Sequence, residues 1–315
     1  MTKALVTGGS GGLAACVIPR LGEAGYEVTA FDVTPPHQPG EMTPWGAAPP
    51  PLDKSVPFVL GDLTSLEDCF RALAFSEAEV LVHLGAIPGP SELRRGGFAA
   101  HQSGPEDATM RSNVMGTYYL MEAARRIGLV KKVVFASTYY VLGLMQINGI
   151  PFKVEYLPID EEHPMKPQDS YGLSKIMGEQ ILEAYAEAYG IQAVAFRLMG
   201  IDKPYREKHL YQEKVDPKPG HVGGPVITTY QYVDARDVAD ATVLALEAEG
   251  LDPFEAFYLV TDSIYEEDTK SVVARAWPDL VPLAKDLVGT DGIISAAKAK
   301  RKLGFEPHYS WRGQK

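Results

Sequence analysis

Short apolar runs rich in β-branched residues alternate with longer stretches of helical periodicity through the first two thirds of the chain. The short runs predict strands over Ala4–Thr7, Glu27–Asp32, Pro57–Leu60, Val80–Leu84, Lys132–Ala136 and Gln192–Leu198. The longer stretches predict helices near Gly12–Ala24, Leu66–Phe75, Ala108–Ile127 and Ser170–Tyr189. Strands that alternate with helices form βαβ units with right-handed crossovers. The pattern therefore predicts an α/β protein with a Rossmann-type doubly wound parallel sheet.

Two stretches interrupt this alternation. Thr34–Ser55 carries seven prolines, which predicts an extended loop. Gly85–Asp107 is polar and glycine-rich, and we expect it to form a mobile flap near a site.

The last third of the chain is less regular. Beyond Gly200 the prolines and glycines predict long loops, with a helix near Ala235–Glu249, a strand at Ala256–Val260 and a last helix near Ser295–Lys302. We expect a main domain over residues 1–198, to which 232–249 returns. Residues 199–231 and 250–315 are then expected to form a smaller C-terminal cap that binds the substrate.

Composition narrows the class of protein. Of the 315 residues 45% are apolar and 23% are charged, which excludes a disordered chain. The net charge of −11 repels nucleic acid, and no apolar run is long enough to cross a bilayer, so we expect neither partner. No secretory leader precedes the first strand. Two cysteines and seven scattered histidines predict a cytoplasmic protein without disulfides or a metal site.

A glycine-rich turn, Gly8-Gly9-Ser10-Gly11-Gly12-Leu13-Ala14, joins the first predicted strand to the first helix. In dinucleotide-binding turns the first glycine permits the tight turn, and the second lets a pyrophosphate approach the backbone. The free amides at the start of the helix then face the phosphates. We therefore predict that Gly8, Gly11, Gly12 and Leu13 bind a dinucleotide.

Asp32 ends the next predicted strand, 24 residues after Gly8. About 20 residues separate such a turn from a carboxylate that binds the adenosine ribose. This carboxylate would repel a 2′-phosphate and no arginine follows it closely, so NAD is favoured over NADP. A turn without a ligand, followed by an ordinary strand-end aspartate, is the alternative.

One Tyr-x-x-x-Lys occurs, at Tyr171 and Lys175. Chance alone predicts about one such pair in this composition, so only its context carries weight. Both residues open a predicted helix and share one face, while Ser137 and Thr138 end a strand at the sheet edge where ligands bind. A nearby ammonium and an oxidised nicotinamide would both lower the tyrosine pKa. We predict that Tyr171 accepts a proton from a substrate alcohol as hydride leaves its carbon.

These motifs form an ordered series with others along the chain. The full set is Gly8–Ala14, Asp32, Asp62-Leu63, His83-Leu84-Gly85-Ala86, Asn113, Thr138 and Tyr171 with Lys175. In order and spacing the series resembles that of the extended short-chain dehydrogenase/reductases, which include the NAD-dependent epimerase/dehydratases. The resemblance covers residues 1–198 and continues weakly through 232–239 and 298–311. It implies an NAD-binding domain over 1–198.

The resemblance also implies catalytic roles. Tyr171 resembles the general base or acid, and Lys175 resembles the residue that lowers its pKa and holds the nicotinamide ribose. Thr138 would orient the substrate hydroxyl, with Ser137 as the alternative.

Further roles follow for the cofactor site. Asp62 and Leu63 would flank the adenine, and Leu84, Gly85 and Ala86 would line the cofactor cleft. For Asn113 two alternatives stay open, a structural position in its helix or a role near Lys175.

Departures from the family pattern bear on the reaction. Tyr139 and Tyr140 follow Thr138 where dehydratases usually carry Asp-Glu, so we do not expect dehydration. Gly200 stands where nucleotide-sugar epimerases usually carry an asparagine that contacts the diphosphate. The motifs look closer to the uronate dehydrogenase branch, which oxidises free sugar acids.

In that branch polar substrate contacts stand where Pro88, Tyr139 and Tyr140 stand here. Our candidate substrate residues are Pro88, Ser137, Thr138, Tyr139 and Arg206. Arg206 is preferred over Arg94, Arg95 and Arg111 as the partner of a substrate carboxylate, which a guanidinium can bind bidentately.

The preferred hypothesis is an NAD-dependent dehydrogenase of a sugar, sugar acid or similar polyol. A sugar epimerase that retains its NAD is the alternative, and an inactive NAD-sensing scaffold is a third. Family members commonly pair through the helices predicted at Ala108–Ile127 and Ser170–Tyr189, so the resemblance implies a homodimer.

Overall fold

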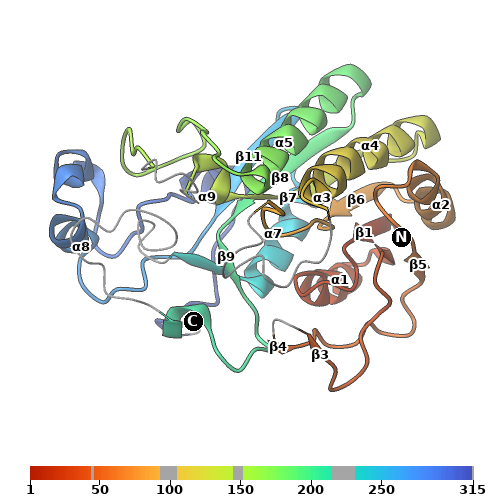
Figure 1. Cartoon of the computed structure of the whole chain (residues 1–315), viewed down its shortest axis with the longest axis horizontal. Helices are drawn as coiled ribbons and strands as arrows, with labels where there is room; N and C mark the ends of the chain where they lie inside the picture. The colour runs from red at the N-terminus through yellow and green to blue at the C-terminus, as the bar shows by residue number, and fades with distance from the viewer. Residues whose placement is uncertain (44–45, 93–104, 145–151, 214–230, 314–315) are drawn as a thin grey trace.

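The computed structural model describes residues 1–43, 46–92, 105–144, 152–213 and 231–313. Seven parallel strands form the central sheet in the order β11-β8-β7-β6-β1-β2-β5. They are β1 Lys3–Thr7, β2 Glu27–Asp32, β5 Phe58–Leu60, β6 Val80–His83, β7 Lys132–Thr138, β8 Gln192–Leu198 and β11 Phe254–Leu259. The strand order reverses at β1, because β2 lies on one side of it and β6 on the other. The predicted Rossmann-type doubly wound sheet is confirmed (Figure 1).

Helices cover both faces of the sheet. On one face α1 Ala14–Glu23 packs against α7 Ala235–Glu247. On the other face α4 Gly116–Ile127 lies between α2 Leu66–Ser76 and α5 Ser170–Tyr189.

Side chains alternate along β1 between these two layers. Ala4 and Val6 belong to the core under α1, whereas Leu5 belongs to the core under α2. Because both faces of the strand are buried, its sequence is a continuous apolar run and does not alternate with polar residues.

The first and last turns of α5 explain why its predicted bounds are correct. The Asp169 carboxylate accepts a hydrogen bond from the amide of Gly172 at 2.8 Å and caps the helix start. Gly190, with φ +70°, ends the helix.

The helix predicted over Ala108–Ile127 has a less regular start. It consists of α3 Ala108–Met110, a π-helical turn over Arg111–Met115 and then α4. Other boundaries also differ by a few residues; for example, α1 begins at Ala14 and β7 continues to Thr138.

The C-terminal third corrects part of the predicted domain division. Strand β11 pairs in parallel with β8, so residues 254–259 belong to the sheet and not to the cap, although the prediction assigned 250–315 to the cap. Helix α7 packs against α1 and contacts β7 of this sheet. Residues 93–104 of the predicted flap and 214–230 of the predicted cap lie outside the described residues.

Smaller elements lie around this sheet. A two-stranded sheet pairs β9 Gly200–Asp202 with β10 Tyr232–Asp234, and a hairpin pairs β3 Met42–Thr43 with β4 Gly46–Ala47. The remaining helices of the described residues are α8 Thr269–Ala276 and α9 Ala297–Leu303, with 3₁₀ turns at Tyr139–Leu142, Leu210–Glu213 and Pro278–Asp286. The sequence did not predict α8. Among the described helices, none combines the length and apolarity that crossing a bilayer requires.

The turns that follow β1 and β6 touch at the carboxyl edge of the sheet. Gly8 has φ +70°, and a Cβ placed on it would lie 2.7 Å from the amide nitrogen of Gly85. Only glycine meets both conditions. This is the reversal point of the strand order, where α/β sheets bind their ligands.

Candidate active site

The glycine turn over Gly8–Ala14 leaves backbone amides free at the start of α1. The Gly11 amide donates to the Gly8 carbonyl oxygen at 2.8 Å, which closes the turn. Leu13 stands at the N-cap without a side-chain hydrogen bond, and the first helical turn has no acidic residue. These features make the helix start suitable for an anionic ligand.

The Asp32 carboxylate is fixed at the end of β2 by two backbone amides. It accepts hydrogen bonds from Ser10 at 3.0 Å and from Thr34 at 2.9 Å, one on each oxygen. Each oxygen keeps a further lone pair that can accept a hydrogen bond. The position therefore suits a partner with two hydroxyl groups, such as a ribose.

A cavity of about 220 Å³ lies between these two features. It gathers eight predicted cofactor residues: Gly8, Gly11, Asp32, Asp62, Leu63, Leu84, Gly85 and Ala86. Its other lining residues, which the sequence analysis missed, are Phe31, Val33, Gly61, Ile87 and Ser112. No motif marks these five. They line the cavity because they neighbour the predicted ones in the folded chain.

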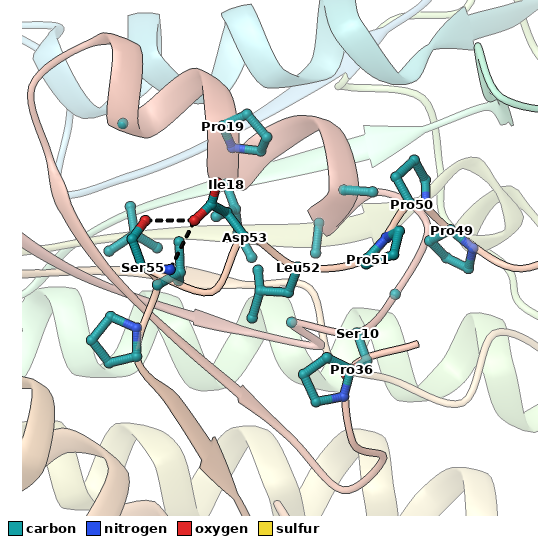
Figure 2. A pocket seen from close by; sticks show the side chains of 18 of the residues that line it. Ser10, Ile18, Pro19, Pro36, Pro49, Pro50, Pro51, Leu52, Asp53 and Ser55 are labelled. Carbon is teal, nitrogen blue, oxygen red and sulfur yellow. Dashed lines mark hydrogen bonds between the residues drawn. The ribbon is translucent and has the colours of Figure 1, made fainter. Parts of the chain in front are cut away.

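A larger cavity of about 540 Å³ lies along α1 beside the proline-rich segment. Figure 2 shows Ile18 and Pro19 of α1 at its wall, together with Pro36 and Leu52 of that segment. Its lining includes none of the three predicted catalytic residues. We therefore do not assign the chemistry to this cavity.

The three predicted catalytic residues come together where β7 meets α5. Thr138 is the last residue of β7, and its side chain interacts with the Tyr171 hydroxyl in the first turn of α5. Lys175 follows one turn later. Its ammonium donates to the Ala136 carbonyl oxygen at 2.7 Å and lies 5.9 Å from the Tyr171 ring centre.

The pKa of Tyr171 is raised, whereas the sequence analysis expected it to be lowered. Burial raises the pKa of Tyr171 to about 12, and the interaction with Thr138 only partly opposes this rise. Burial also lowers the pKa of Lys175 to about 7. The predicted lowering of the tyrosine pKa is therefore not produced by the chain itself, because removing both groups from water disfavours their charged forms.

A buried ion pair lies one helical turn beyond Lys175 on α5. Glu179 of α5 and Arg197 of β8 are both buried, and a guanidinium nitrogen lies 2.9 Å from a carboxylate oxygen. Ser137 donates to the same carboxylate at 2.5 Å. The negative charge of Glu179 raises the pKa of Lys175 against the effect of burial. Because the Ser137 hydroxyl donates to Glu179, Ser137 is less suited than Thr138 to bind a substrate hydroxyl.

Asn113 connects the cavity to the catalytic helix. Its amide group pairs with the backbone of Ile87, at 2.8 Å and 3.0 Å, and donates to the Ser174 hydroxyl at 3.0 Å. Ser174 precedes Lys175. These contacts combine both alternatives for Asn113, since it braces the structure at a point next to Lys175.

His83 is a second buried polar residue that the motif series contains. Its ring lies between the hydroxyls of Thr7, at 2.7 Å, and Thr117, at 3.0 Å. Its pKa is lowered to about 3, mainly by burial and also by the charge of Lys175. His83 is therefore neutral near pH 7 and links the strands to α4.

The predicted substrate residues differ in how far they are buried. Pro88 is exposed, whereas Tyr139 is buried and its ring centre lies 4.4 Å from that of Tyr140. The Tyr140 ring meets Tyr171 edge to face at 6.2 Å. Tyr140 therefore lies against the ring of the proposed catalytic tyrosine.

The arginine candidates also differ. Arg111 pairs with Asp107 at 2.6 Å and is mostly exposed, which makes it an ordinary surface residue. Arg94 and Arg95 lie outside the described residues. Arg206 is half-buried, and its Nε has no hydrogen-bond partner in the described part of the chain.

Lys203 and Tyr205 lie directly against the glycine turn, and the sequence analysis missed both. A Cβ placed on Gly12 would lie 3.0 Å from the Lys203 ammonium and would overlap the Tyr205 hydroxyl. They follow the short strand β9 in an irregular segment, where no periodic pattern could have placed them.

Comparison with known proteins identifies the family of this chain. The sequence profile of the NAD dependent epimerase/dehydratase family matches residues 4–259. A protein of Methanocaldococcus jannaschii, provisionally named UDP-glucose 4-epimerase, is 28% identical over 77% of this chain and 72% of its own length. A uronate dehydrogenase of Pseudomonas syringae pv. tomato is 36% identical over 34% of each chain.

A solved structure shares the fold. The NAD complex of UDP-glucose 4-epimerase from Thermus thermophilus aligns with a TM-score of 0.65 and 21% identity, over 99% of this chain and 96% of that one.

Proposed function

Because this chain belongs to the NAD dependent epimerase/dehydratase family, we propose that it removes a hydride from a secondary alcohol of a sugar, a sugar acid or a similar polyol. The meeting of Thr138, Tyr171 and Lys175 at the carboxyl end of β7 carries the proposal. Asn113 joins this group to Ile87 in the lining of the predicted cofactor cavity.

The residues present fit NAD. The glycine turn offers amides to a diphosphate, and the fixed Asp32 carboxylate suits the ribose hydroxyls of the adenosine. Leu63 lies against Gly85, where a Cβ would meet it at 2.8 Å, and provides an apolar surface for the adenine. When bound, NAD supplies the acceptor for the hydride.

The chain itself handles the proton. In this proposal the Thr138 hydroxyl orients the substrate alcohol, and the Tyr171 phenol oxygen accepts its proton. The Lys175 ammonium lies 5.9 Å from the centre of the Tyr171 ring. At about this distance and an effective dielectric constant of about 20, it would stabilise a phenolate by about 3 kcal/mol, roughly a hundredfold in acid dissociation. This is less than the fall from a pKa of about 12 that action near neutral pH requires. Positive charge brought by the oxidised cofactor is therefore needed as well.

A sugar epimerase that keeps its NAD is the second candidate. The names of the Methanocaldococcus and Thermus proteins favour it. Such an enzyme returns the hydride to the opposite face of the same carbon, so it needs the same three residues. Gly200 argues for the dehydrogenase, because it lies beside the apolar Leu210 side chain and has no side-chain amide to offer a nucleotide diphosphate.

Turnover assays distinguish the two reactions. The purified protein with added NAD is expected to accumulate free NADH, measured by absorbance, with at least one member of a panel of uronates, aldoses and polyols. The same preparation is assayed by chromatography for interconversion of UDP-glucose and UDP-galactose. Interconversion without NADH release from any free sugar, together with one NAD retained per chain, would establish the epimerase.

We also propose that the protein forms a homodimer through α4, α5 and the turn before α4. Met115, Tyr118 and Leu173 expose 39%, 41% and 43% of their surface on these elements. Leu173→Glu is expected to convert a dimer into a monomer by light scattering, because a charge in an apolar contact must be desolvated. Leu129→Glu, at a similarly exposed position outside these helices, is the control. A wild-type monomer would contradict the proposal.

A further inference from the structure

The Lys203 ammonium lies beside the glycine turn, and the Arg206 guanidinium lies near enough to Lys203 to lower its pKa. Lys203 and Arg206 follow β9, and the Arg206 amide donates to the Lys203 carbonyl oxygen at 3.0 Å, so one tight turn carries both. In the described ranges no carboxylate lies within ion-pair distance of either side chain. The chain has a net charge of −11, so it carries more carboxylates than cations. A lack of carboxylates therefore does not explain why these two cations have no ion pair among the residues that the structure describes.

The Lys203 ammonium lies next to the positive end of α1, and this juxtaposition is unfavourable unless an anion binds there. The start of α1 carries the positive end of the helix dipole and has neither an acidic first turn nor a side-chain cap. The Lys203 ammonium lies against Gly12 in this turn, and the Arg206 Nε is buried without a hydrogen-bond partner among the described residues. The helix start and the Lys203 ammonium therefore place positive charge at the glycine turn, and Arg206 adds a second cation near Lys203.

The chemistry of the side chains indicates the anion. An ammonium on a flexible stem binds phosphate oxygens as a point charge, whereas planar carboxylates are matched better by a guanidinium. The Tyr205 hydroxyl lies at the same glycine and can donate one hydrogen bond. We propose that Lys203 and Tyr205 bind the diphosphate of the dinucleotide together with the amides of the glycine turn. This inference rests on the proposed function, since it assumes that a dinucleotide occupies the crevice.

The same contact explains why Gly12 is a glycine. A side chain at position 12 would displace Tyr205 and Lys203. From the sequence, Gly12 was predicted only to bind the cofactor. In the structure, its lack of a side chain also leaves room for Lys203 and Tyr205 of the predicted cap. The cap segment and the phosphate-binding turn are thus parts of one binding site.

The charge of Lys203 depends on pH. Its pKa is lowered to about 8, mainly by burial and also by the charge of Arg206, while Cys16 on α1 acts in the opposite direction. Cys16 has a pKa raised to about 11 and faces Asp234 and Arg236, while burial raises the pKa of Tyr205 to about 12. Below pH 8 the ammonium is present and can bind an anion. Above pH 8 it is lost, so diphosphate affinity falls as the pH rises.

Nucleotide binding measured by calorimetry tests the proposal without turnover. Lys203→Met, which keeps most of the stem, is expected to raise the Kd for ADP about 10- to 100-fold and to leave that for adenosine within about twofold. Tyr205→Phe is expected to raise the Kd for ADP several-fold. Wild-type affinity for ADP should weaken between pH 7 and 9, and this dependence should disappear in Lys203→Met.

Controls separate binding from stability. Lys208→Met removes an exposed lysine of the same segment and should leave ADP affinity unchanged. Lys203→Arg keeps a charge and should retain most of the affinity if Lys203→Met unfolds the protein. Equal loss of ADP and adenosine in Lys203→Met, or unchanged ADP binding, would overturn the proposal. Weakened binding of UDP with normal binding of ADP would also overturn it, because the site would then serve a nucleotide-sugar substrate.

These outcomes are independent of the proposed reaction. Failure of every sugar to give NADH would reject the dehydrogenase, but a selective loss of ADP affinity would still support the diphosphate site.

Discussion

Tyr171→Phe is expected to lower the turnover number on the best substrate by about 100- to 10,000-fold. The change removes one oxygen atom, the atom proposed to accept the substrate proton. The phenylalanine ring keeps the edge-to-face contact with Tyr140, whose ring centre lies 6.2 Å away, so the fold should be retained. Steady-state kinetics give the loss, and calorimetry should show NAD affinity within about threefold of wild type.

Tyr189→Phe is the matched control, because it makes the same change at the exposed last turn of α5. It should leave the turnover number within about twofold. Retention of more than about a tenth of wild-type activity by Tyr171→Phe would show that another group takes the proton.

Much of the fold could be predicted because its signals are local. The capping carboxylate of Asp169 and the glycine at 190 define α5 within a few residues of sequence. The pairing of β11 with β8 is not local, because a long segment separates these strands in the chain, and it escaped prediction. Helix α8 carries only eight residues, which is too short for a helical period to stand out.

The family and the cofactor were predictable for a different reason. A series of short motifs carries the resemblance, and the family match over residues 4–259 confirms it together with NAD as the cofactor of the family. The match also confirms that the protein is an enzyme of this NAD-dependent class.

The parts of the site that the sequence did not reveal depend on folded contacts. Lys203 reaches the glycine turn from about 190 residues further along the chain, and no motif links the two positions. The raised pKa of Tyr171 likewise follows from burial, which composition cannot supply. The motif predicted which residues meet, but their charge states depend on what surrounds them.

The buried pair Glu179–Arg197 provides the second large expected effect. Arg197→Met is expected to lower the free energy of unfolding by about 3–5 kcal/mol, measured by urea denaturation. Glu179 would keep only the Ser137 hydroxyl as a side-chain hydrogen-bond donor among the described residues. The Glu161 carbonyl oxygen, which accepts from Arg197 at 2.9 Å, would also lose this donor. A buried carboxylate without its counter-ion then carries most of the cost.

Arg275→Met removes an arginine from an exposed pair with Glu267 and should cost less than about 1 kcal/mol. Adding Glu179→Gln to Arg197→Met removes the unpaired charge, so the double variant should recover part of the lost stability. Its remaining defect should be functional, because Glu179 raises the pKa of Lys175 and its loss favours a neutral lysine near pH 7. If Arg197→Met costs no more than Arg275→Met, water reaches the Glu179 carboxylate and the pair does not support the catalytic helix.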